Sequence, residues 1–574
     1  MQQPLAGLVS LIAVLLVPSV GIAQGHGDMF GICVESHEQG WPQVCYNPLA
    51  DEYLAVWEDY RGAGSDIYGQ FIDGDGSLRG EDIPICASAG HQYWPRLDFD
   101  PSTARYLIVF EDWRNAPDGD IRGVFLNADG SFFDTPTSEG DHTFGICTNA
   151  SAIYTCAVAF NPESHRYLVV WGDFRNDPTG QSFTGADVFG QMVGADGTLM
   201  SPADPAVNFP VANHPDILES VADVTFCMGT MEWLVAYGTA AGCVMAQRVS
   251  ATGALIDRDG AVTTVPAPLV VSAQFQNGPD CFQARVKANC QGLACIPDWH
   301  ECEVVWKGLA EGFTDNDVWG QRIGFVNEAG AWVAKYVAAD GTVTENVSNH
   351  AISIQADWVG PADIDFSVQD NEFLVAWGDP RTQGLAGQDL YYQRLWVDVS
   401  QGGQMVWLDD DRVNTVEETE NIPVFTTPAY EGSLLGIAHS TARNEFLVAF
   451  TYVPEGAQTG DIMGVIASGS PPVAADDKPV VAERIWLEPF RPNPFDHTTA
   501  VRFAIPREGR VTVTVSDLVG HAVATLSDGV RPAGAHTVSW DGTNGAGVPV
   551  GAGVYVCSVR CDDRVETRRV ALIR

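Results

Sequence analysis

Acidic and basic side chains recur together at the same point of a repeated segment. An aspartate follows a run of apolar residues, and an arginine comes two positions after it. The pairs are Asp59 with Arg61, Asp112 with Arg114, Asp173 with Arg175, and Asp379 with Arg381. A catalytic carboxylate would be expected once rather than in several repeats, so we predict structural ion pairs that brace neighbouring repeats. The alternative is a ring of charges on one face that grips a polar ligand.

Histidines recur shortly before the first strand expected in several repeats, and tryptophans follow the first two of them. These residues are His37, Trp41, His91, Trp94, His214 and His350. The connections that carry them should lie on one face of the fold, which makes them a candidate ligand face for a sugar or a metal ion. A position repeated for structural reasons is the alternative.

One turn imitates the start of a calcium-binding loop. It reads Asp73-x-Asp75-Gly76, but Pro84 stands where such a loop has its bidentate glutamate. We therefore predict no cofactor, with calcium at this turn as the alternative. The sequence contains no Gly-x-Ser-x-Gly elbow, His-Glu-x-x-His helix, Walker loop or sialidase-type Asp box. Their absence favours a protein that is not an enzyme.

The element that must position these residues is a five-residue apolar run that ends in an aromatic residue. It occurs seven times, and the aromatic ends are 53 to 73 residues apart. The copies lie at residues 53–57, 106–110, 167–171, 233–237, 302–306, 373–377 and 446–450. Because the pattern aromatic-Leu-Val-Val-Trp is apolar throughout, both faces of such a strand must be covered.

Each copy is surrounded by other expected strands. A short alternating strand precedes it, and a third strand with an acidic start follows, as in Asp66-Ile-Tyr-Gly-Gln70. A tight turn such as Asp75-Gly76 then leads to a fourth strand. Four antiparallel strands per repeat are the plan of a propeller blade, whose second strand lies between two neighbouring blades. We therefore predict an all-β fold with a seven-bladed β-propeller over residues 24–467.

The two ends of the repeat array complement each other. No fourth strand follows the last copy, whereas Phe30-Gly-Ile-Cys33, before the first copy, matches the fourth-strand segment Phe144-Gly-Ile-Cys147. We predict that residues 29–34 pair with residues 461–466, complete the seventh blade and close the ring, which hides its edges.

Composition restricts the setting and the partners. Lys+Arg number 31 against 74 Asp+Glu, so the net charge is -43, which repels nucleic acid. An apolar run at residues 5–20, followed by Gly21-Ile22-Ala23, predicts a signal peptide over residues 1–23. No later stretch has the length of apolar sequence that spans a membrane. We expect a protein that is secreted or held at the outer cell surface.

Thirteen cysteines in an exported chain predict disulfides. The candidates are Cys33 with Cys45, Cys147 with Cys156, Cys227 with Cys243, two local bridges among Cys281, Cys290, Cys295 and Cys302, and Cys557 with Cys561. Cys86 has no cysteine near it in the sequence.

A separate domain follows a spacer at residues 468–483, which is rich in Pro, Ala and Asp. Residues 484–574 alternate between apolar and polar types and predict an Ig-like β-sandwich. An ordered series of motifs runs through them: Pro492-Asn493-Pro494-Phe495, Asp517-x-x-Gly520, Gly534, Trp540-Asp541-Gly542 and Gly553-x-Tyr555.

This series resembles the C-terminal sorting domain of type IX secretion cargo and the Ig-like domain of flagellar hook-capping proteins. The resemblance implies export by an outer-membrane secretion machinery, which would be the partner of this domain. It also implies that the domain is then cleaved off or holds the protein at the surface.

For the whole chain we predict a secreted or surface-displayed binding module that is not an enzyme and holds an unknown protein or glycan on its propeller face. The first alternative is a carbohydrate-active hydrolase or lyase, which needs two unpaired carboxylates about 5 to 10 Å apart near the central funnel. The second is a structural spacer that presents other parts, for which we expect a funnel filled by apolar side chains.

Overall fold

The structure is a computed structural model, and the chain divides into two compact units, Met1–Ser470 and Pro471–Arg574. Each unit is described by itself. The described residues are 29–115, 119–148, 153–176, 186–202, 208–213, 219–239, 243–265, 267–272, 284–291, 294–295, 300–308, 317–328, 331–339, 342–347, 349–353, 359–379, 389–398, 404–408, 422–425, 430–454, 457, 459–468, 486–487, 499–505, 509–516, 521–531, 534–545, 548–551, 553–561 and 564–572.

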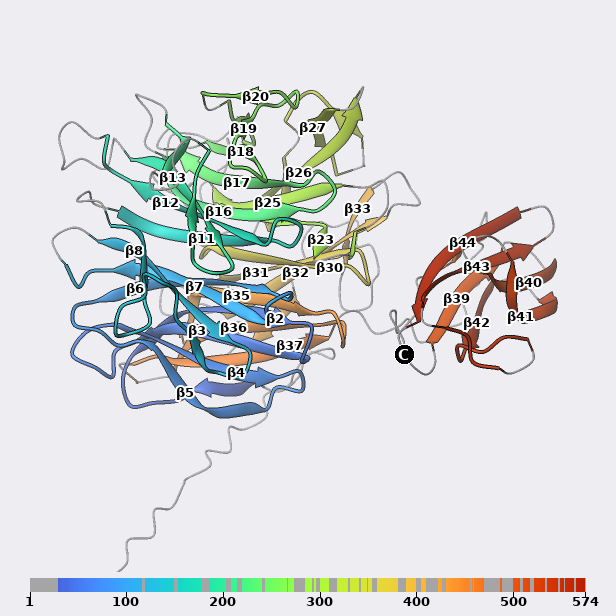
Figure 1. Cartoon of the computed structure of the whole chain (residues 1–574), viewed down its shortest axis with the longest axis horizontal. Helices are drawn as coiled ribbons and strands as arrows, with labels where there is room; N and C mark the ends of the chain where they lie inside the picture. Colours follow the sequence, from blue (N-terminus) through green and yellow to red (C-terminus); the bar gives the residue numbers. More distant parts are fainter. Residues whose placement is uncertain are drawn as a thin grey trace, which may run out of the picture. The chain divides into compact units, whose positions relative to one another are not determined.

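The first unit is built from antiparallel β-sheets, and no helix occurs in the described residues (Figure 1). Seven of its described sheets have four or more strands. We number these sheets along the chain, by their second strands.

The first sheet contains β2 (Gln39–Asn47), β3 (Glu52–Asp59), β4 (Asp66–Asp73) and β5 (Leu78–Cys86). The second contains β6 (Gln92–Asp100), β7 (Arg105–Asp112), β8 (Asp120–Asn127), β9 (Phe132–Phe133) and β10 (Phe144–Cys147). The third contains β11 (Ile153–Asn161), β12 (Arg166–Asp173), β13 (Asp187–Gly194), β14 (Leu199–Met200) and β15 (Phe209–Ala212). The fourth contains β16 (Glu219–Cys227), β17 (Glu232–Thr239), β18 (Val244–Ser250), β19 (Leu255–Ile256), β20 (Val262–Thr263) and β21 (Leu269–Val270).

The fifth sheet contains β22 (Arg285–Ala288), β25 (Glu301–Gly308), β26 (Asp317–Glu328), β27 (Ala331–Val337), β28 (Val343–Thr344) and β29 (His350–Ser353). A small hairpin, β23 (Cys290–Gln291) with β24 (Ala294–Cys295), interrupts it in sequence. The sixth contains β30 (Ala362–Ser367), β31 (Glu372–Asp379), β32 (Asp389–Asp398), β33 (Gln404–Leu408) and β34 (Ile422–Phe425). The seventh contains β35 (Tyr430–Ser440), β36 (Glu445–Val453), β37 (Asp461–Ser468) and β1 (Phe30–Cys33).

The second strand of each sheet is the predicted aromatic run, and its side chains are covered on both sides. In β3, Leu54 and Val56 pack in one cluster with Ile108 of the second sheet. Ala55 and its neighbours on the opposite side of β3 pack in another cluster with Leu447 of the seventh sheet. The unbroken apolar pattern therefore arises because each second strand lies between two neighbouring sheets, as predicted.

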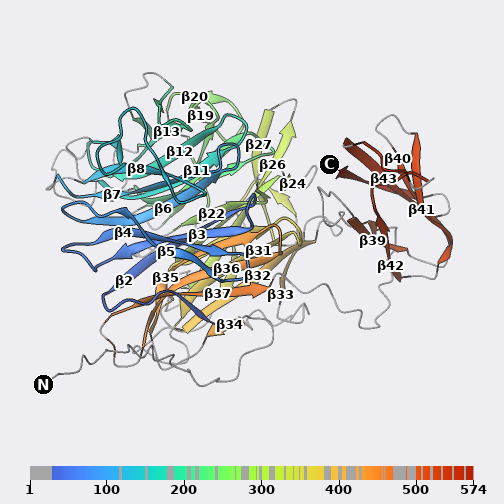
Figure 2. The same ribbon diagram turned by 60° about the horizontal axis from the view of Figure 1, so that its bottom comes forward.

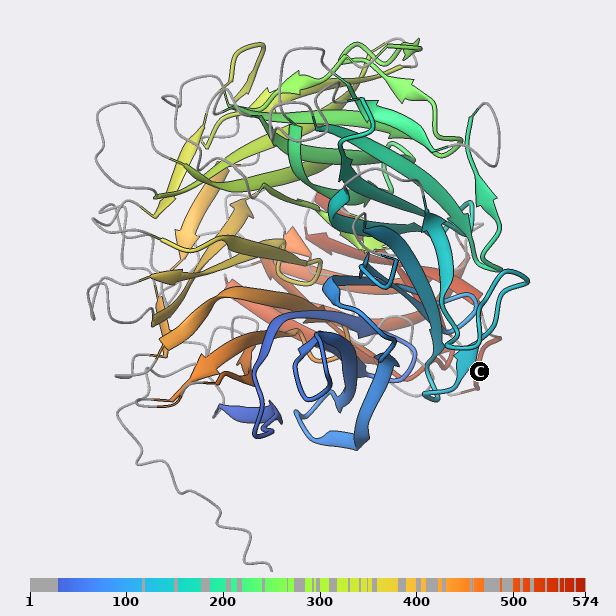
Figure 3. The ribbon, with the colours of Figure 1, turned by 90° about the vertical axis from the view of Figure 1, so that its left-hand side faces the viewer.

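The first strands of the sheets contact one another in sequence order and come back to the start. β2 contacts β6, which contacts β11; β11 contacts β16; β16 contacts β22; β22 contacts β30; β30 contacts β35; and β35 contacts β2. Figure 3 shows the same order, with the blue first sheet beside the orange seventh. The first strands thus surround a common centre.

The first described strand of the chain joins the last sheet of this ring. β1 pairs antiparallel with β37, with Phe30 opposite Gly464 and Cys33 opposite Ile462. The predicted pairing of residues 29–34 with residues 461–466 is confirmed. Figure 2 shows β37 among the strands of the seventh sheet.

The recurrent glycine of the third strands has a packing reason. A Cβ on Gly464 would lie 2.7 Å from the ring of Phe30, and one on Gly123 would lie 2.9 Å from the ring of Phe144. In these two sheets the outermost strand therefore lays an aromatic ring against the bare backbone of the third strand. The glycine of Asp-x-x-Gly leaves room for this close approach.

The second unit consists of two antiparallel sheets in its described residues. One contains β38 (Trp486–Leu487), β39 (Thr499–Ile505) and β42 (Gly534–Trp540). The other contains β40 (Gly509–Ser516), β41 (Ala522–Arg531), β43 (Gly553–Cys561) and β44 (Arg564–Leu572). Val501 and Trp540 of the first sheet share a core with Val513 and Val559 of the second. The two sheets pack face to face, as in a β-sandwich.

Within the described part of either unit, no helical segment has the length and apolar character needed to cross a membrane.

Candidate functional site

The predicted Asp–Arg pairs form in the three repeats whose arginine lies in the described residues. Arg61 is 2.6 Å from Asp59, Arg114 is 2.6 Å from Asp112, and Arg175 pairs with Asp173. All three aspartates are fully buried. Asp379 accepts a hydrogen bond from the indole of Trp377, and Arg381 lies outside the described residues.

Each of these arginines also reaches a cysteine of the preceding sheet. Arg61 donates to the Sγ of Cys33 at 3.3 Å, at a sequence separation of 28 residues. Two further contacts repeat this geometry and this separation, Arg114 with Cys86 at 3.4 Å and Arg175 with Cys147 at 3.4 Å. The cysteines end the outermost strands β1, β5 and β10, so each arginine links its own sheet to its neighbour. The constant separation of 28 residues between cysteine and arginine is visible in the sequence. The predicted cysteine–cysteine pairs did not take it into account.

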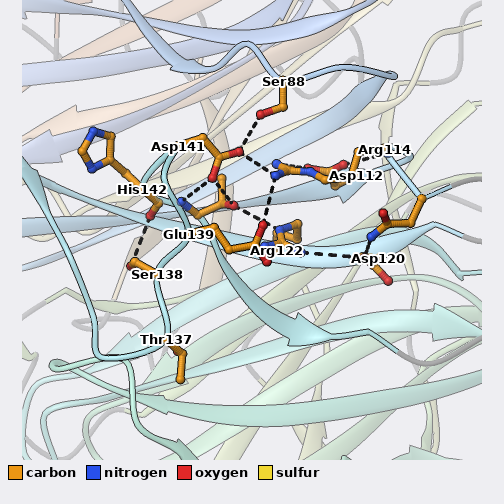
Figure 4. A network of polar contacts seen from close by, with 12 residues as sticks. Ser88, Asp112, Arg114, Asp120, Arg122, Thr137, Ser138, Glu139, Asp141 and His142 are labelled. Atoms are coloured by element: carbon orange, nitrogen blue, oxygen red, sulfur yellow. Dashed lines mark hydrogen bonds and ion pairs between the residues drawn. The ribbon is translucent and has the colours of Figure 1, made fainter.

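In the second sheet the arginine belongs to a larger polar network (Figure 4). Arg114 is 2.6 Å from Asp141, which also accepts a hydrogen bond from Ser88 of the loop that follows β5. Glu139 pairs with both Arg114 and Arg122. Although burial opposes the shift, hydrogen bonds from its partners lower the pKa of Asp141.

This network replaces an aromatic contact that two other sheets use. The guanidinium of Arg61 lies 4.1 Å from the centre of the Tyr68 ring, and that of Arg175 lies 4.0 Å from the centre of Phe189. Arg122 stands at the corresponding position of the second sheet. Two neighbouring guanidinium groups would repel each other, and the carboxylate of Glu139 between them removes that repulsion.

Two tryptophans of the predicted ligand face come together at the same end of the first two sheets. The rings of Trp41 in β2 and Trp94 in β6 are 5.6 Å apart, and both side chains are half-buried. Each sits where the strand register shifts, with φ of 57° for Trp41 and 52° for Trp94. A positive φ is costly for a large side chain and is typical of positions that function or special packing maintains.

Buried glutamates hold these irregular backbone positions. Glu58 of β3 accepts a hydrogen bond from the backbone N–H of Trp94 at 2.8 Å, and Glu111 of β7 accepts one from the backbone N–H of Thr155. Burial raises the pKa of Glu58 to about 7 and that of Glu111 to about 8. Both side chains are enclosed, with residue exposures of 1% and 2%, so they act on the backbone rather than on a ligand.

The predicted histidines do not form one site. His37 and His91 are exposed and lie just before β2 and β6, and His91 stacks on Tyr93 with ring centres 5.5 Å apart. His350 begins the outermost strand β29 and is buried, with its Nε2 3.0 Å from Glu303. The structure therefore places His350 away from the ends of the first strands. His214 lies outside the described residues.

A charged cluster that sequence analysis missed lies at the centre of the ring. Its members come from first strands of four sheets. They are Arg96, Asp98, Asp223, Arg285, Lys287, Asp363 and Asp365, which we call the central cluster. Lys287 of the fifth sheet is 2.7 Å from Asp365 of the sixth and also interacts with Asp98 of the second. In the sequence, charged residues alternate with an apolar one in Asp363-Ile-Asp365 and Arg285-Val-Lys287, which indicates that the charged side chains of each strand share one face. That these faces meet follows only from the ring, which brings the strands together.

The carboxylates of the central cluster satisfy backbone groups that the sheets leave unpaired. A first strand has a partner strand on one side only. Every second N–H of that strand points to the other side and needs another acceptor there. Asp98 accepts from Phe160 N–H at 2.7 Å and Asp223 from Val286 N–H at 3.0 Å. Asp363 accepts from Ile437 N–H and Asp365 from His439 N–H. The hydroxyl of Thr225, next to the central cluster, accepts from Ala288 N–H in the same way.

The electrostatics of the central cluster follow from its enclosure. Burial raises the pKa of Asp98 and of Asp363. Burial, together with the charge of Arg285, lowers the pKa of Arg96 to about 10. The centre is charged, and its named carboxylates are engaged by cations or by backbone N–H groups. Among the described residues, the centre of the ring therefore holds paired charged side chains in addition to apolar ones.

The predicted disulfide pairs need correction. Cys33 faces Arg61 and Asp82 in an outermost strand, whereas Cys45 lies in a first strand with its Sγ 3.8 Å from Asp98. Cys33 lies in the outermost strand of the seventh sheet and Cys45 in the first strand of the first sheet, so the pairing of Cys33 with Cys45 is wrong.

The pairing of Cys147 with Cys156 fails for the same reason. Cys147 ends the outermost strand β10, and Cys156 lies in the first strand β11, where its Sγ points to the carbonyl oxygen of Trp94. Cys557 and Cys561 lie four residues apart on the extended strand β43, about 13 Å, which is too far for a disulfide.

The cysteines of the fourth and fifth sheets have a different arrangement. The Sγ of Cys227 lies 2.8 Å from that of Cys302, not beside Cys243. Cys290 and Cys295 are opposite each other in the hairpin β23–β24, but their side chains, like Cys281, lie outside the described residues. Cys86 has Arg114 as its neighbour.

In the turn Asp73-x-Asp75-Gly76, which resembles the start of a calcium loop, the carboxylate of Asp75 binds a residue of the same turn. The Oδ1 of Asp75 accepts hydrogen bonds from both the backbone N–H and the hydroxyl of Ser77. The described residues contain no group of three or more His, Cys, Asp and Glu side chains arranged to hold a metal ion.

Several motif residues of the second unit lie at or beside one tryptophan, Trp540. The indole of Trp540 donates to the carbonyl oxygen of Thr543 at 2.8 Å, and its ring lies 5.1 Å from that of Tyr555. Asp541 accepts from the N–H of Thr543, and Gly542 has a φ of 68°, which favours glycine. Gly534 and Gly553 begin β42 and β43. The motif segments 492–495 and 517–520 lie outside the described residues.

Comparison with solved structures finds propeller-like and other β-rich proteins at low sequence identity. A fungal alcohol oxidase of the AA5 family, solved with copper, is 9% identical over 96% of this chain and 100% of its own, with a TM-score of 0.41. The sialidase of Trypanosoma rangeli is 11% identical over 87% of this chain and 86% of its own, at 0.34. A leech intramolecular trans-sialidase is 10% identical over 78% of this chain and 71% of its own, at 0.37. At such TM-scores these likenesses carry no inference about activity.

No curated protein matches the chain. A protein-family model matches the chain in the second unit, over the β-sandwich described above. Residues 493–563 match the FlgD Ig-like domain, and the C-terminal part of this protein is therefore an Ig-like domain of that type.

Proposed function

We propose that residues 29–468 form a seven-bladed β-propeller that binds an extracellular glycan without chemically changing it. The proposal is carried by the pair Trp41 and Trp94, two half-buried indoles 5.6 Å apart at the same end of adjacent first strands. Flat aromatic surfaces favour the apolar faces of sugar rings, and their polar edges tolerate water.

The charge of the chain narrows the kind of glycan. A net charge of -43 repels polyanions at long range, so the ligand is a neutral polysaccharide rather than an acidic one. The engagement of the carboxylates Asp98, Asp363 and Asp365 with cations and backbone N–H groups supports binding over hydrolysis. The charged central cluster likewise supports binding over a role as a spacer.

We further propose that the C-terminal Ig-like domain serves export and attachment at the cell surface. The support is the match to the FlgD Ig-like domain together with the ordered motifs of residues 492–555. Deleting residues 484–574 tests this part: the truncated chain should stay inside the producing cell, and its normal appearance at the surface would contradict the proposal.

The glycan proposal is tested by sedimentation of the purified full chain with insoluble neutral polysaccharides such as cellulose and xylan. Trp41→Ala and Trp94→Ala should each weaken binding about tenfold, because each removes one stacking surface. Trp332→Ala is the matched control, since Trp332 is also half-buried but lies in β27 of the fifth sheet. Equal binding by all variants would refute the proposed site, and release of soluble sugar by the wild type would favour a hydrolase or lyase instead.

A further inference from the structure

We propose that Cys227 and Cys302 form a disulfide that joins the fourth sheet to the fifth. Their Sγ atoms are 2.8 Å apart, and the residues are 75 positions apart in the sequence. Cys227 ends β16 and Cys302 is the second residue of β25. Both are buried in one apolar cluster made by these two sheets, with exposures of 4% and 0%.

The repeat supports this pairing independently of the distance. Cys302 occupies the first position of the aromatic run, which is Tyr53, Tyr106, Tyr167, Trp233, Phe373 and Phe446 in the other copies. Cys302 is therefore the one member of its series that is not aromatic. The first position of the run holds an aromatic ring in the other six sheets and a cysteine in the fifth sheet.

The partner position changes at the same interface. Cys227 stands opposite the residue that begins β17, and the residues at that place in other first strands are Asn47, Asp100, Asn161, Ser367 and Ser440. These are all polar. Cys227 is the one sulfur-containing member of this series in the described strands.

The two positions face each other between neighbouring sheets elsewhere in the ring as well. The side chain of Tyr53 lies beside that of Ser440, and the side chain of Tyr106 lies beside that of Asn47. At the interface between the fourth and fifth sheets, both members of this pair are replaced, and both replacements are cysteine. A covalent bond there takes the place of the tyrosine contact.

The chemistry is a thiol–disulfide exchange with a small-molecule or protein disulfide as the oxidant. One cysteine thiolate attacks the oxidant and releases one thiol, and the second cysteine then displaces the other thiol as the Sγ–Sγ bond forms. The two electrons and two protons lost by the cysteines end on the two released thiols. Because both cysteines are buried in the folded unit, the exchange takes place before the fourth and fifth sheets close on each other.

The test uses the full chain folded with a mixture of oxidised and reduced glutathione. After free thiols are blocked under denaturing conditions, the chain is digested without reduction, and the peptides are identified by mass spectrometry. The expected result is a linked peptide pair that contains Cys227 and Cys302 and has lost two hydrogen atoms. Blocked thiols at both positions, or a link from either to Cys243 or to the cysteines at 281, 290 and 295, would overturn the proposal.

Stability provides a second readout. Cys227→Ser and Cys302→Ser should each lower the melting temperature of the oxidised chain by several degrees, and the double variant should lower it little further, because either change removes the whole bond. Cys243→Ser is the matched control and should leave both the linked peptide and the melting temperature unchanged. Additive effects of the two single substitutions would contradict a bond between them.

Discussion

Glu58 of the first sheet accepts a hydrogen bond from the backbone N–H of Trp94 in the second sheet, 2.8 Å away. One buried carboxyl thereby holds a tryptophan backbone in the left-handed region, where its φ is 52°. Glu111 repeats this contact between the second sheet and Thr155 of the third. The position of Trp94 beside Trp41 on the candidate ligand face depends on this hydrogen bond from its backbone to Glu58.

Glu58 and Glu111 should make the first unit less stable as the pH rises from about 5 to about 8. Their folded-state pKa values of about 7 and about 8 lie above the ordinary glutamate pKa of 4.5, so the folded state holds protons that the unfolded state has released. Their stabilising contribution is complete below pH 4.5 and is lost as the pH passes through 7 and 8. For Glu58 alone the loss is about 3 kcal/mol.

The measurement is urea unfolding of the full chain at pH 5 and pH 8. Glu58→Gln keeps an acceptor for Trp94 but does not titrate, so it should remove part of the pH dependence. Glu81→Gln is the matched control, because Glu81 is exposed. Wild type and Glu58→Gln with the same pH dependence would show that Glu58 is ionised normally.

Arg114→Ala should destabilise the first unit by about 3 kcal/mol, because it leaves the fully buried Asp112 without its cation. It also removes the contact with Cys86 of the preceding sheet. Arg443→Ala is the matched control: its pair with Asp51 is 41% and 31% exposed and should contribute less than about 1 kcal/mol. The measurement is the free energy of unfolding of both variants. An equal loss of stability in the two would refute the role of Arg114 in bracing neighbouring sheets.

Gly464→Val should open the seam between β1 and β37. The added Cβ would lie 2.7 Å from the ring of Phe30, so β1 must move away and expose the edge of β37. Limited proteolysis or hydrogen exchange should show residues 29–34 losing protection at least tenfold. Gly140→Ala, where a Cβ meets nothing within 4 Å, should leave protection unchanged. Unchanged protection in Gly464→Val would mean that β1 does not depend on this contact.

The strands and their order could be predicted from the sequence because each is encoded locally. The run at residues 53–57 is apolar at every position, and only a strand covered on both faces needs that pattern. The glycine of Asp-x-x-Gly and the aromatic residue of Phe-Gly-Ile-Cys lie in segments that pair directly. Backbone pairing follows from such short patterns, and they predict the closing strand β1.

The contacts between sheets were decided by the tertiary structure. Cys227 meets Cys302 rather than Cys243, and Cys33 meets Arg61 rather than Cys45, because the stacking of whole sheets selects these neighbours. Lys287 meets Asp365 only after the ring brings the first strands together. Cys227 and Cys302 are 75 positions apart and Lys287 and Asp365 are 78 apart, and each of these two contacts occurs once rather than in every repeat. Side-chain partners across sheets are therefore fixed by packing geometry, which the periodicity of a single strand does not contain.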